Sequence, residues 1–109
     1  GIKTAFTKER NLKIHAIATI TIILISSLFQ ISKLEFIIIL LCISLVISLE
    51  LINTAIEELS NLYSSKHNLT IKSIKEIAAG SVFIASLASF LIGCIIFIPK
   101  CLKHIEFWK

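Results

Sequence analysis

Three long apolar blocks constrain this 109-residue chain more than any other feature of its sequence. The first is uncharged over 16–32, the second is uncharged over 36–49, and the third covers 77–98. A helix needs about 20 consecutive apolar residues to cross the hydrocarbon of a bilayer. An isolated strand would leave its backbone groups without hydrogen bonds in lipid. The blocks therefore predict an all-α integral membrane protein with three transmembrane helices.

The composition agrees with a single membrane domain over residues 1–109. The chain is 56% hydrophobic and only 17% charged, and its mean hydropathy is +0.93. A water-soluble domain needs more polar surface than this to cover its core. We expect Thr70 to cap the third helix and Pro99 to end it. The expected spans are 12–31, 35–61 and 74–98, followed by a basic tail at 100–109.

The charges predict the orientation of the chain in the membrane. Its formal net charge is +4, and most of its 11 Lys and Arg residues lie in the N-terminal segment and the 62–75 loop. Because Lys and Arg remain on the cytoplasmic side, we expect both segments to be cytoplasmic. Basic and aromatic residues do not interleave, so a nucleic-acid partner is not expected. The three cysteines form no C-x-x-C pair and are interpreted as apolar fillers.

A polar stripe runs along the second predicted helix. Glu50 and Glu57 are two helical turns apart, with Asn53 between them, so all three share one face. A charged side chain within the bilayer is costly and is by default a functional group. The structural alternative for Glu50 is a hydrogen bond to another helix or a pair with a lysine. Two carboxylates and an amide are also the hard oxygen ligands that Mg²⁺ prefers.

Four further residues are candidates at the cytoplasmic ends of the helices. Glu9 can complete the cation site, or it is a solvated acid favoured by the helix dipole. Lys75 can bind phosphate as a point charge, or it only marks the cytoplasmic side. His67 can contact a nucleotide. His15 is expected to form a hydrogen bond near the membrane surface rather than to bind metal.

Three segments carry a resemblance to a known family. ERNLKIH at 9–15, ELINTAIE at 50–57 and KEIAAGSV at 75–82 resemble the motifs of the prokaryotic diacylglycerol kinase family, which includes undecaprenol kinases. The resemblance covers about residues 5–100, in the same order and on the same helices. It implies a lipid kinase of the bacterial inner membrane, a homotrimer that phosphorylates diacylglycerol or undecaprenol with ATP and Mg²⁺.

The same resemblance implies roles for individual residues. Glu50 is expected to be the catalytic base, and Asn53 to position the reacting groups. Glu9 and Glu57 are expected to hold the metal that bridges the ATP phosphates. Lys75 is expected to contact phosphate.

The chain departs from the family pattern at two positions near the nucleotide. Asn61 stands where the family usually has Asp, and Glu76 stands where it usually has Asp. We still expect Glu76 and His67 to belong to the nucleotide site. The family also usually has an amphipathic surface helix before the first span, which we expect to be missing or cut away here. The alternative functions are an inactive structural homologue and a membrane subunit that conducts ions or protons through Glu50.

Overall fold

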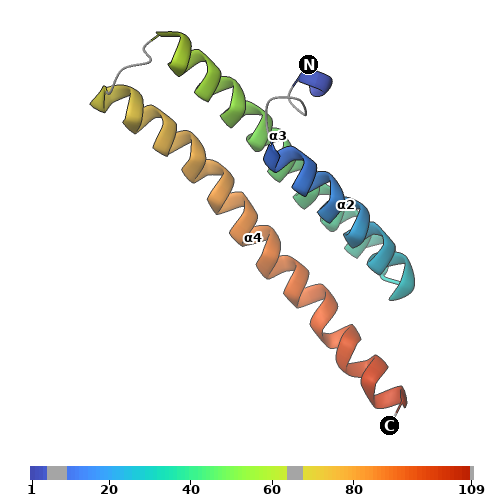
Figure 1. The fold of residues 1–109 in the computed structure, drawn as a ribbon. Coiled ribbons are helices and arrows are strands. Elements are labelled where there is room, and N and C mark those ends of the chain that lie inside the picture. Colours follow the sequence, from blue (N-terminus) through green and yellow to red (C-terminus); the bar gives the residue numbers. More distant parts are fainter. Residues whose placement is uncertain (5–9, 64–67, 109) are drawn as a thin grey trace.

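The computed structural model describes residues 1–4, 10–63 and 68–108. It contains three long helices, α2 (Arg10–Leu28), α3 (Lys33–Tyr63) and α4 (Leu69–Trp108) (Figure 1). Each is long and apolar enough to cross a membrane. No strand occurs in these described ranges. The expectation of an all-α membrane fold with three spanning helices is therefore confirmed.

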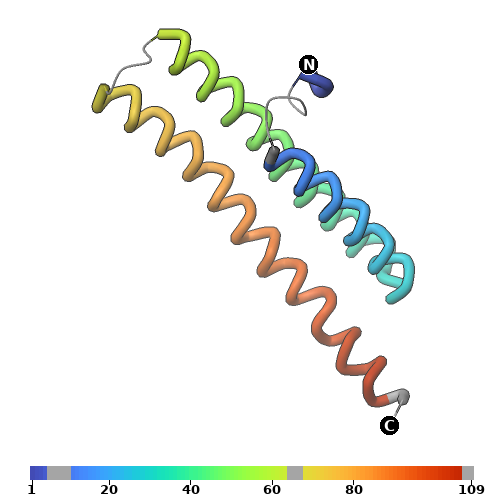
Figure 2. The backbone as a smooth tube through the Cα atoms, in the orientation of Figure 1, coloured from blue at the N-terminus to red at the C-terminus, as the bar shows by residue number. Residues whose placement is uncertain are grey.

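The helices form an elongated bundle of 60 × 26 × 23 Å. α3 and α4 run antiparallel and pack along each other, while α2 packs mainly on α3 (Figure 2). α2 covers only one half of α3, so the other half of α3 and the start of α4 project beyond it. The buried apolar side chains come from all three helices: Leu12, Ile39, Val46, Ala78, Ala85 and Ile96.

The corner between α2 and α3 is closed by backbone hydrogen bonds. The amide of Gln30 donates to the carbonyl of Ser27 (3.3 Å), and the amide of Ile31 donates to that of Ser26 (3.4 Å). This pair of bonds is a Schellman motif, which satisfies carbonyls at the end of a helix. Gln30 occupies its left-handed position with a φ of 49°, where glycine is the usual residue. α2 therefore ends earlier than the expected limit at residue 31.

A capping box begins α3 directly after this corner. The amide of Glu35 donates to Ser32 Oγ (3.1 Å), and the amide of Ser32 donates to Glu35 Oε1 (2.9 Å). These reciprocal bonds satisfy amides that have no partner within the helix. Glu35 Oε1 also lies 3.1 Å from Lys100 Nζ on α4. Glu35 therefore links the start of α3 to α4.

The expectation that Thr70 caps the third helix is wrong. Asn68 is the cap, because its Oδ1 accepts hydrogen bonds from the amides of Thr70 (2.9 Å) and Ile71 (3.2 Å). Both Asn and Thr are favourable caps. The earlier start at Leu69 places the Asn68 side chain at the free amides of the first turn.

The expectation that Pro99 ends the third helix is also wrong, since α4 continues through Pro99 to Trp108. Proline in a helix interior costs roughly 3 kcal/mol. Contacts between helices on both sides of Pro99 offset this cost. Phe29 makes edge-on ring contacts with Phe97 (6.3 Å) and His104 (6.0 Å), and Lys100 pairs with Glu35.

Candidate active site

The polar stripe predicted on the second helix lies within α3. Glu50, Asn53 and Thr54 are all buried, with 4%, 7% and 8% of their surfaces exposed. The helical spacing of the sequence places them on one side of α3, and that side faces the protein. This burial is notable because many large apolar residues of α3, such as Leu41 and Leu45, are exposed. The chain therefore buries polar groups and exposes apolar ones, as expected for a surface that meets lipid.

Hydrogen bonds within α3 orient the stripe. Asn53 Nδ2 donates to Glu57 Oε1 (3.1 Å), and Thr54 Oγ1 donates to the backbone carbonyl of Glu50 (3.0 Å). Asn53 Oδ1 is buried and has no hydrogen-bond partner among the described residues. A buried amide oxygen without a partner is costly. Asn53 therefore presents an acceptor that remains available to a ligand beside the Glu57 carboxylate.

His15 brings α2 to the Glu50 carboxylate. The distance from His15 Nε2 to Glu50 Oε2 is 3.8 Å, which is longer than a hydrogen bond and within the range of an ion pair. The sequence predicted only an unspecified hydrogen bond for His15. No spacing in the sequence indicates this contact, because it joins two helices whose relative rotation is set by packing.

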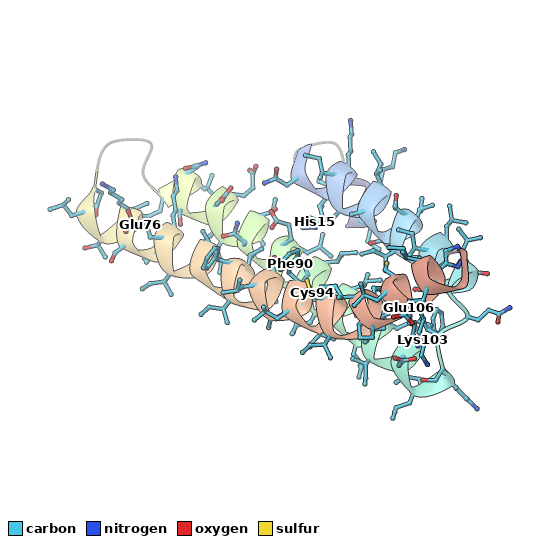
Figure 3. All side chains as sticks on the ribbon, turned by 90° about the horizontal axis from the view of Figure 1, so that it is seen from below. His15, Glu76, Phe90, Cys94, Lys103 and Glu106 are labelled. Carbon is cyan, nitrogen blue, oxygen red and sulfur yellow. The ribbon has the colours of Figure 1, made fainter. Side chains whose placement is uncertain are left out.

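Lys75 and Asn61 join the parts of α3 and α4 that project beyond α2. Lys75 Nζ donates a hydrogen bond of 2.5 Å to Asn61 Oδ1. Because Asn61 is neutral, it holds the ammonium group without neutralising its charge. Glu76 follows Lys75 near the start of α4, and its side chain is exposed. It lies well away from His15 along the bundle (Figure 3). The structure therefore joins Lys75 to α3 by a hydrogen bond and leaves Glu76 exposed on α4.

The remaining candidates, Glu9 and His67, lie outside the described residues. Among the residues that are described, no group of three His, Cys, Asp or Glu side chains is arranged to hold a metal ion. Mg²⁺ commonly takes one or two carboxylates and completes its shell with water and substrate phosphates. The Glu57 carboxylate and the buried Asn53 Oδ1 are oxygen donors that fit this requirement.

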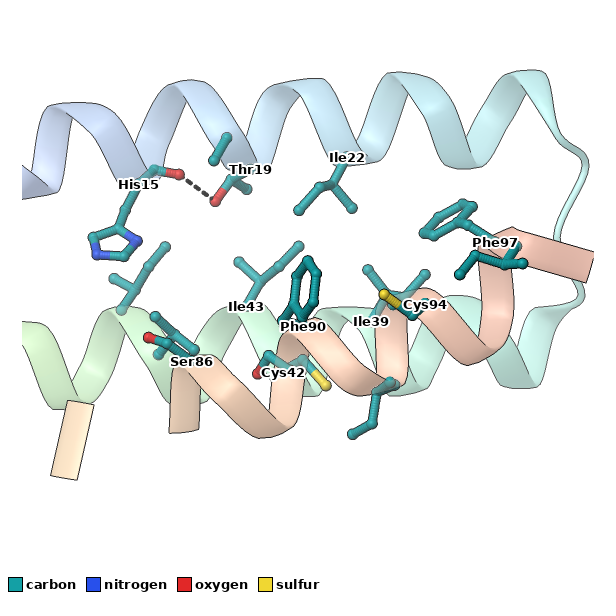
Figure 4. A pocket seen from close by; sticks show the side chains of 17 residues that line it. His15, Thr19, Ile22, Ile39, Cys42, Ile43, Ser86, Phe90, Cys94 and Phe97 are labelled. Atoms are coloured by element: carbon teal, nitrogen blue, oxygen red, sulfur yellow. Dashed lines mark hydrogen bonds between the residues drawn. The ribbon is translucent and has the colours of Figure 1, made fainter. Parts of the chain in front are cut away.

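An apolar groove of about 460 Å³ lies between the three helices, next to the polar stripe. His15 and Thr19 of α2 border it on one side, and Phe90 and Phe97 of α4 on another (Figure 4). Its volume is within the range of small-molecule pockets, about 300–1,000 Å³. The free thiols of Cys42 and Cys94 also line it.

Comparison with known proteins gives the family of this chain. A model of the family described as "Prokaryotic diacylglycerol kinase" matches residues 1–97. An undecaprenol kinase from Bacillus subtilis is 40% identical over 100 residues, which cover 92% of this chain and 81% of that relative. A diacylglycerol kinase from Synechocystis is 34% identical over 105 residues, which cover 94% of this chain and 59% of that relative. No solved structure gives a significant match.

These matches agree with the three helices that are long and apolar enough to cross a membrane. The family model covers most of the chain, and the two relatives cover nearly all of it. This chain therefore belongs to the prokaryotic diacylglycerol kinase family, a family of membrane lipid kinases.

Proposed function

We propose that this chain transfers the γ-phosphoryl group of ATP to the hydroxyl group of a membrane lipid. The observation that carries the proposal is the Glu50 carboxylate, which is only 4% exposed within a membrane-spanning helix. Burying a carboxylate at membrane depth costs ~2.5–3.5 kcal/mol on insertion scales. A function at this position accounts for that cost, and the family membership makes phosphoryl transfer the function.

In the proposed reaction, Glu50 acts as the general base. The lipid hydroxyl oxygen forms a bond to the γ-phosphorus while the bond from that phosphorus to the β,γ-bridging oxygen breaks. The hydroxyl proton passes to the Glu50 carboxylate, and ADP leaves with the bridging oxygen. In this reaction class most of the rate comes from positioning and from offsetting phosphate charge.

Other residues of the stripe bind and orient the reactants. Asn53 holds the Glu57 carboxylate through its amide and offers Oδ1 to the reactants. Glu57, together with Glu9, would hold Mg²⁺, which offsets negative charge on the ATP phosphates. Lys75 binds a phosphate oxygen with the ammonium group that Asn61 orients.

Glu76 and His67 complete the proposed nucleotide site around the start of α4. Glu76 is exposed at the projecting end of the bundle, where a water-soluble nucleotide can approach. This end, together with the N-terminal segment, faces the cytoplasm in the proposed orientation, since it carries the excess of Lys and Arg. The proposed location is the bacterial inner membrane.

The apolar groove supports the choice of a lipid as the phosphoryl acceptor. It begins at His15, beside Glu50, and extends between the helices toward Phe97. A hydrocarbon chain in this groove would hold its hydroxyl end near the Glu50 carboxylate. Burial of the chain against apolar side chains would supply binding energy without polar contacts.

The acceptor is either diacylglycerol, giving phosphatidic acid, or undecaprenol, giving undecaprenyl phosphate. The two relatives are named for one lipid each, and both lipids present a hydroxyl beside apolar chains. The greater identity to the undecaprenol kinase, 40% against 34%, favours undecaprenol. Parallel assays with labelled ATP and each lipid in detergent micelles test this choice through the two values of kcat/KM.

The substitution Glu50→Gln tests the proposed base. It keeps the size and polarity of the side chain but cannot accept the hydroxyl proton, so we expect ATP-dependent lipid phosphorylation to fall by at least about 100-fold. Phosphorylation is measured in micelles, with Glu106→Gln at the far end of α4 as the matched control. Turnover at the wild-type rate in the Glu50 variant would exclude Glu50 as the base.

A further inference from the structure

His15 has no role in the reaction proposed above, although it is the last residue of the segment 9–15. Its Nε2 atom lies 3.8 Å from Glu50 Oε2, and the two side chains are 28% and 6% exposed. The same imidazole borders the apolar groove (Figure 4). His15 therefore lies where the groove meets the carboxylate.

The position of the carboxylate matters for its proposed role as a base. A general base must be ionised and must be aimed at the hydroxyl whose proton it accepts. An imidazole N–H carries a partial positive charge when neutral and a full one when protonated, so it attracts the carboxylate at the observed 3.8 Å without a direct hydrogen bond. His15 approaches the carboxylate from α2, a second helix, whereas the Thr54 bond on α3 reaches the backbone of Glu50.

The backbone of α2 holds His15 in this place. Thr19 Oγ1 donates to the backbone carbonyl of His15 (2.7 Å) one helical turn later, and Thr19 also borders the groove. Leu12, one turn before His15, is 1% exposed and anchors this end of α2 in the bundle. The imidazole is thus carried by a packed segment of helix.

We propose that His15 is a positioning residue, which holds the Glu50 carboxylate toward the end of the groove where the lipid hydroxyl arrives. The inference rests on the proposed lipid kinase function. In this assignment the hydroxyl proton passes to Glu50, and His15 keeps its own proton. Loss of the imidazole leaves the groove intact but lets the carboxylate leave its productive position.

Kinetics of two His15 variants test the proposal. His15→Leu removes the donor, and we expect kcat to fall by about tenfold or more, since small displacements of a catalytic group have effects of that order. The KM for ATP should stay unchanged, because the nucleotide contacts lie elsewhere. His15→Gln restores an N–H donor near the position of Nε2 and should recover most of kcat. Thr21→Val, at an exposed site of α2, is the matched control.

The outcomes separate this inference from the proposed function. If Glu50→Gln is inactive while His15→Leu keeps the wild-type kcat, His15 has no positioning role and the lipid kinase proposal stands. Equal kcat values for the Leu and Gln variants would also overturn the inference, since the donor would then be irrelevant. If the wild-type protein phosphorylates neither lipid, the proposed function is wrong, and the positioning role of His15 is wrong with it.

A spectroscopic measurement tests the contact without relying on activity. We expect Glu50→Gln to shift the imidazole ¹⁵N resonances of His15, and Glu106→Gln to leave them unchanged. The resonances are assigned by their loss in His15→Leu. Unchanged His15 resonances in Glu50→Gln would overturn the contact, even if His15→Leu does not fold.

Discussion

At the scale of single residues, the site depends on polar side chains of α3 and α4 that are joined by hydrogen bonds. Asn53 and Glu57 are joined by a hydrogen bond along α3, while Lys75 reaches Asn61 across from α4. Asn61 is a neutral acceptor. The positive charge of Lys75 is therefore not neutralised by this contact, and it remains effective toward a phosphate.

Lys75→Ala tests this interpretation. A hydrogen bond from a charged donor is worth about 1.5–3 kcal/mol, so we expect the KM for ATP to rise about 10–100-fold. The loss of the exposed bond to Asn61 should change the free energy of unfolding by less than about 1 kcal/mol. Steady-state kinetics with varied ATP gives the KM, with Lys72→Ala on the same helix as the control. Equal KM values in both variants would contradict a phosphate contact at Lys75.

At the scale of elements, the ends of the helices are specified by local hydrogen bonds. The Schellman motif at Gln30 and the capping box at Ser32 reverse the chain between α2 and α3 within a few residues. Glu35 then ties the start of α3 to Lys100. These contacts lie at the opposite end of the bundle from the proposed nucleotide site, so changes here should affect stability rather than the KM for ATP.

Ser32→Ala removes the side-chain acceptor of the capping box. The typical cost of losing a serine cap is about 1 kcal/mol, so we expect the protein to be destabilised by that amount. Unfolding in mixed micelles with increasing denaturing detergent measures the change. Ser27→Ala is the control, because the corner bond that Ser27 accepts is made by its backbone carbonyl, which the substitution keeps. An identical stability of both variants would show that the capping box contributes nothing.

Gln30→Gly should stabilise the protein. The φ of 49° at Gln30 is unfavourable for a residue with a Cβ atom and is readily adopted by glycine. We expect the free energy of unfolding to rise by about 0.5–1 kcal/mol. The greater conformational entropy of glycine in the unfolded chain reduces this gain. Gln30→Val should destabilise instead, since β-branched residues rarely adopt this conformation. The same unfolding experiment compares the stabilities of the two variants. A valine variant more stable than the glycine variant would show that the backbone at Gln30 is not strained.

At the scale of the whole molecule, much of the surface is apolar. Large exposed side chains occur on each helix, for example Ile20, Leu41 and Phe83. In a bilayer such a surface meets lipid tails or other protein chains. α2 packs on only one half of α3, so the bundle presents helix surfaces that further copies of the chain can cover. This arrangement leaves helix surfaces for the homotrimer that the family resemblance implies.

The homotrimer is tested by the mass of the protein in mild detergent. We expect native mass spectrometry to give three chains of 12.1 kDa per particle, because the family resemblance implies a homotrimer. The inactive Glu50→Gln variant should keep the same mass, which separates assembly from catalysis. A catalytically active particle that contains a single chain would contradict the trimer.

The sequence by itself determined the number and type of the elements and one face of the site. Three apolar blocks can satisfy their backbones in lipid only as helices, and the helical period places Glu50, Asn53 and Glu57 on one side. These properties depend on neighbours in the chain, so the pattern of residues is sufficient to predict them.

Only the tertiary structure decided how the helices meet. The contacts of His15 with Glu50 and of Lys75 with Asn61 join different helices, as does the groove. Their existence depends on the rotation and depth of each helix, which side-chain packing sets. The same holds for Pro99, where the favourable contacts of Phe97 and Lys100 with other parts of the chain allow α4 to continue past a residue that would end an isolated helix.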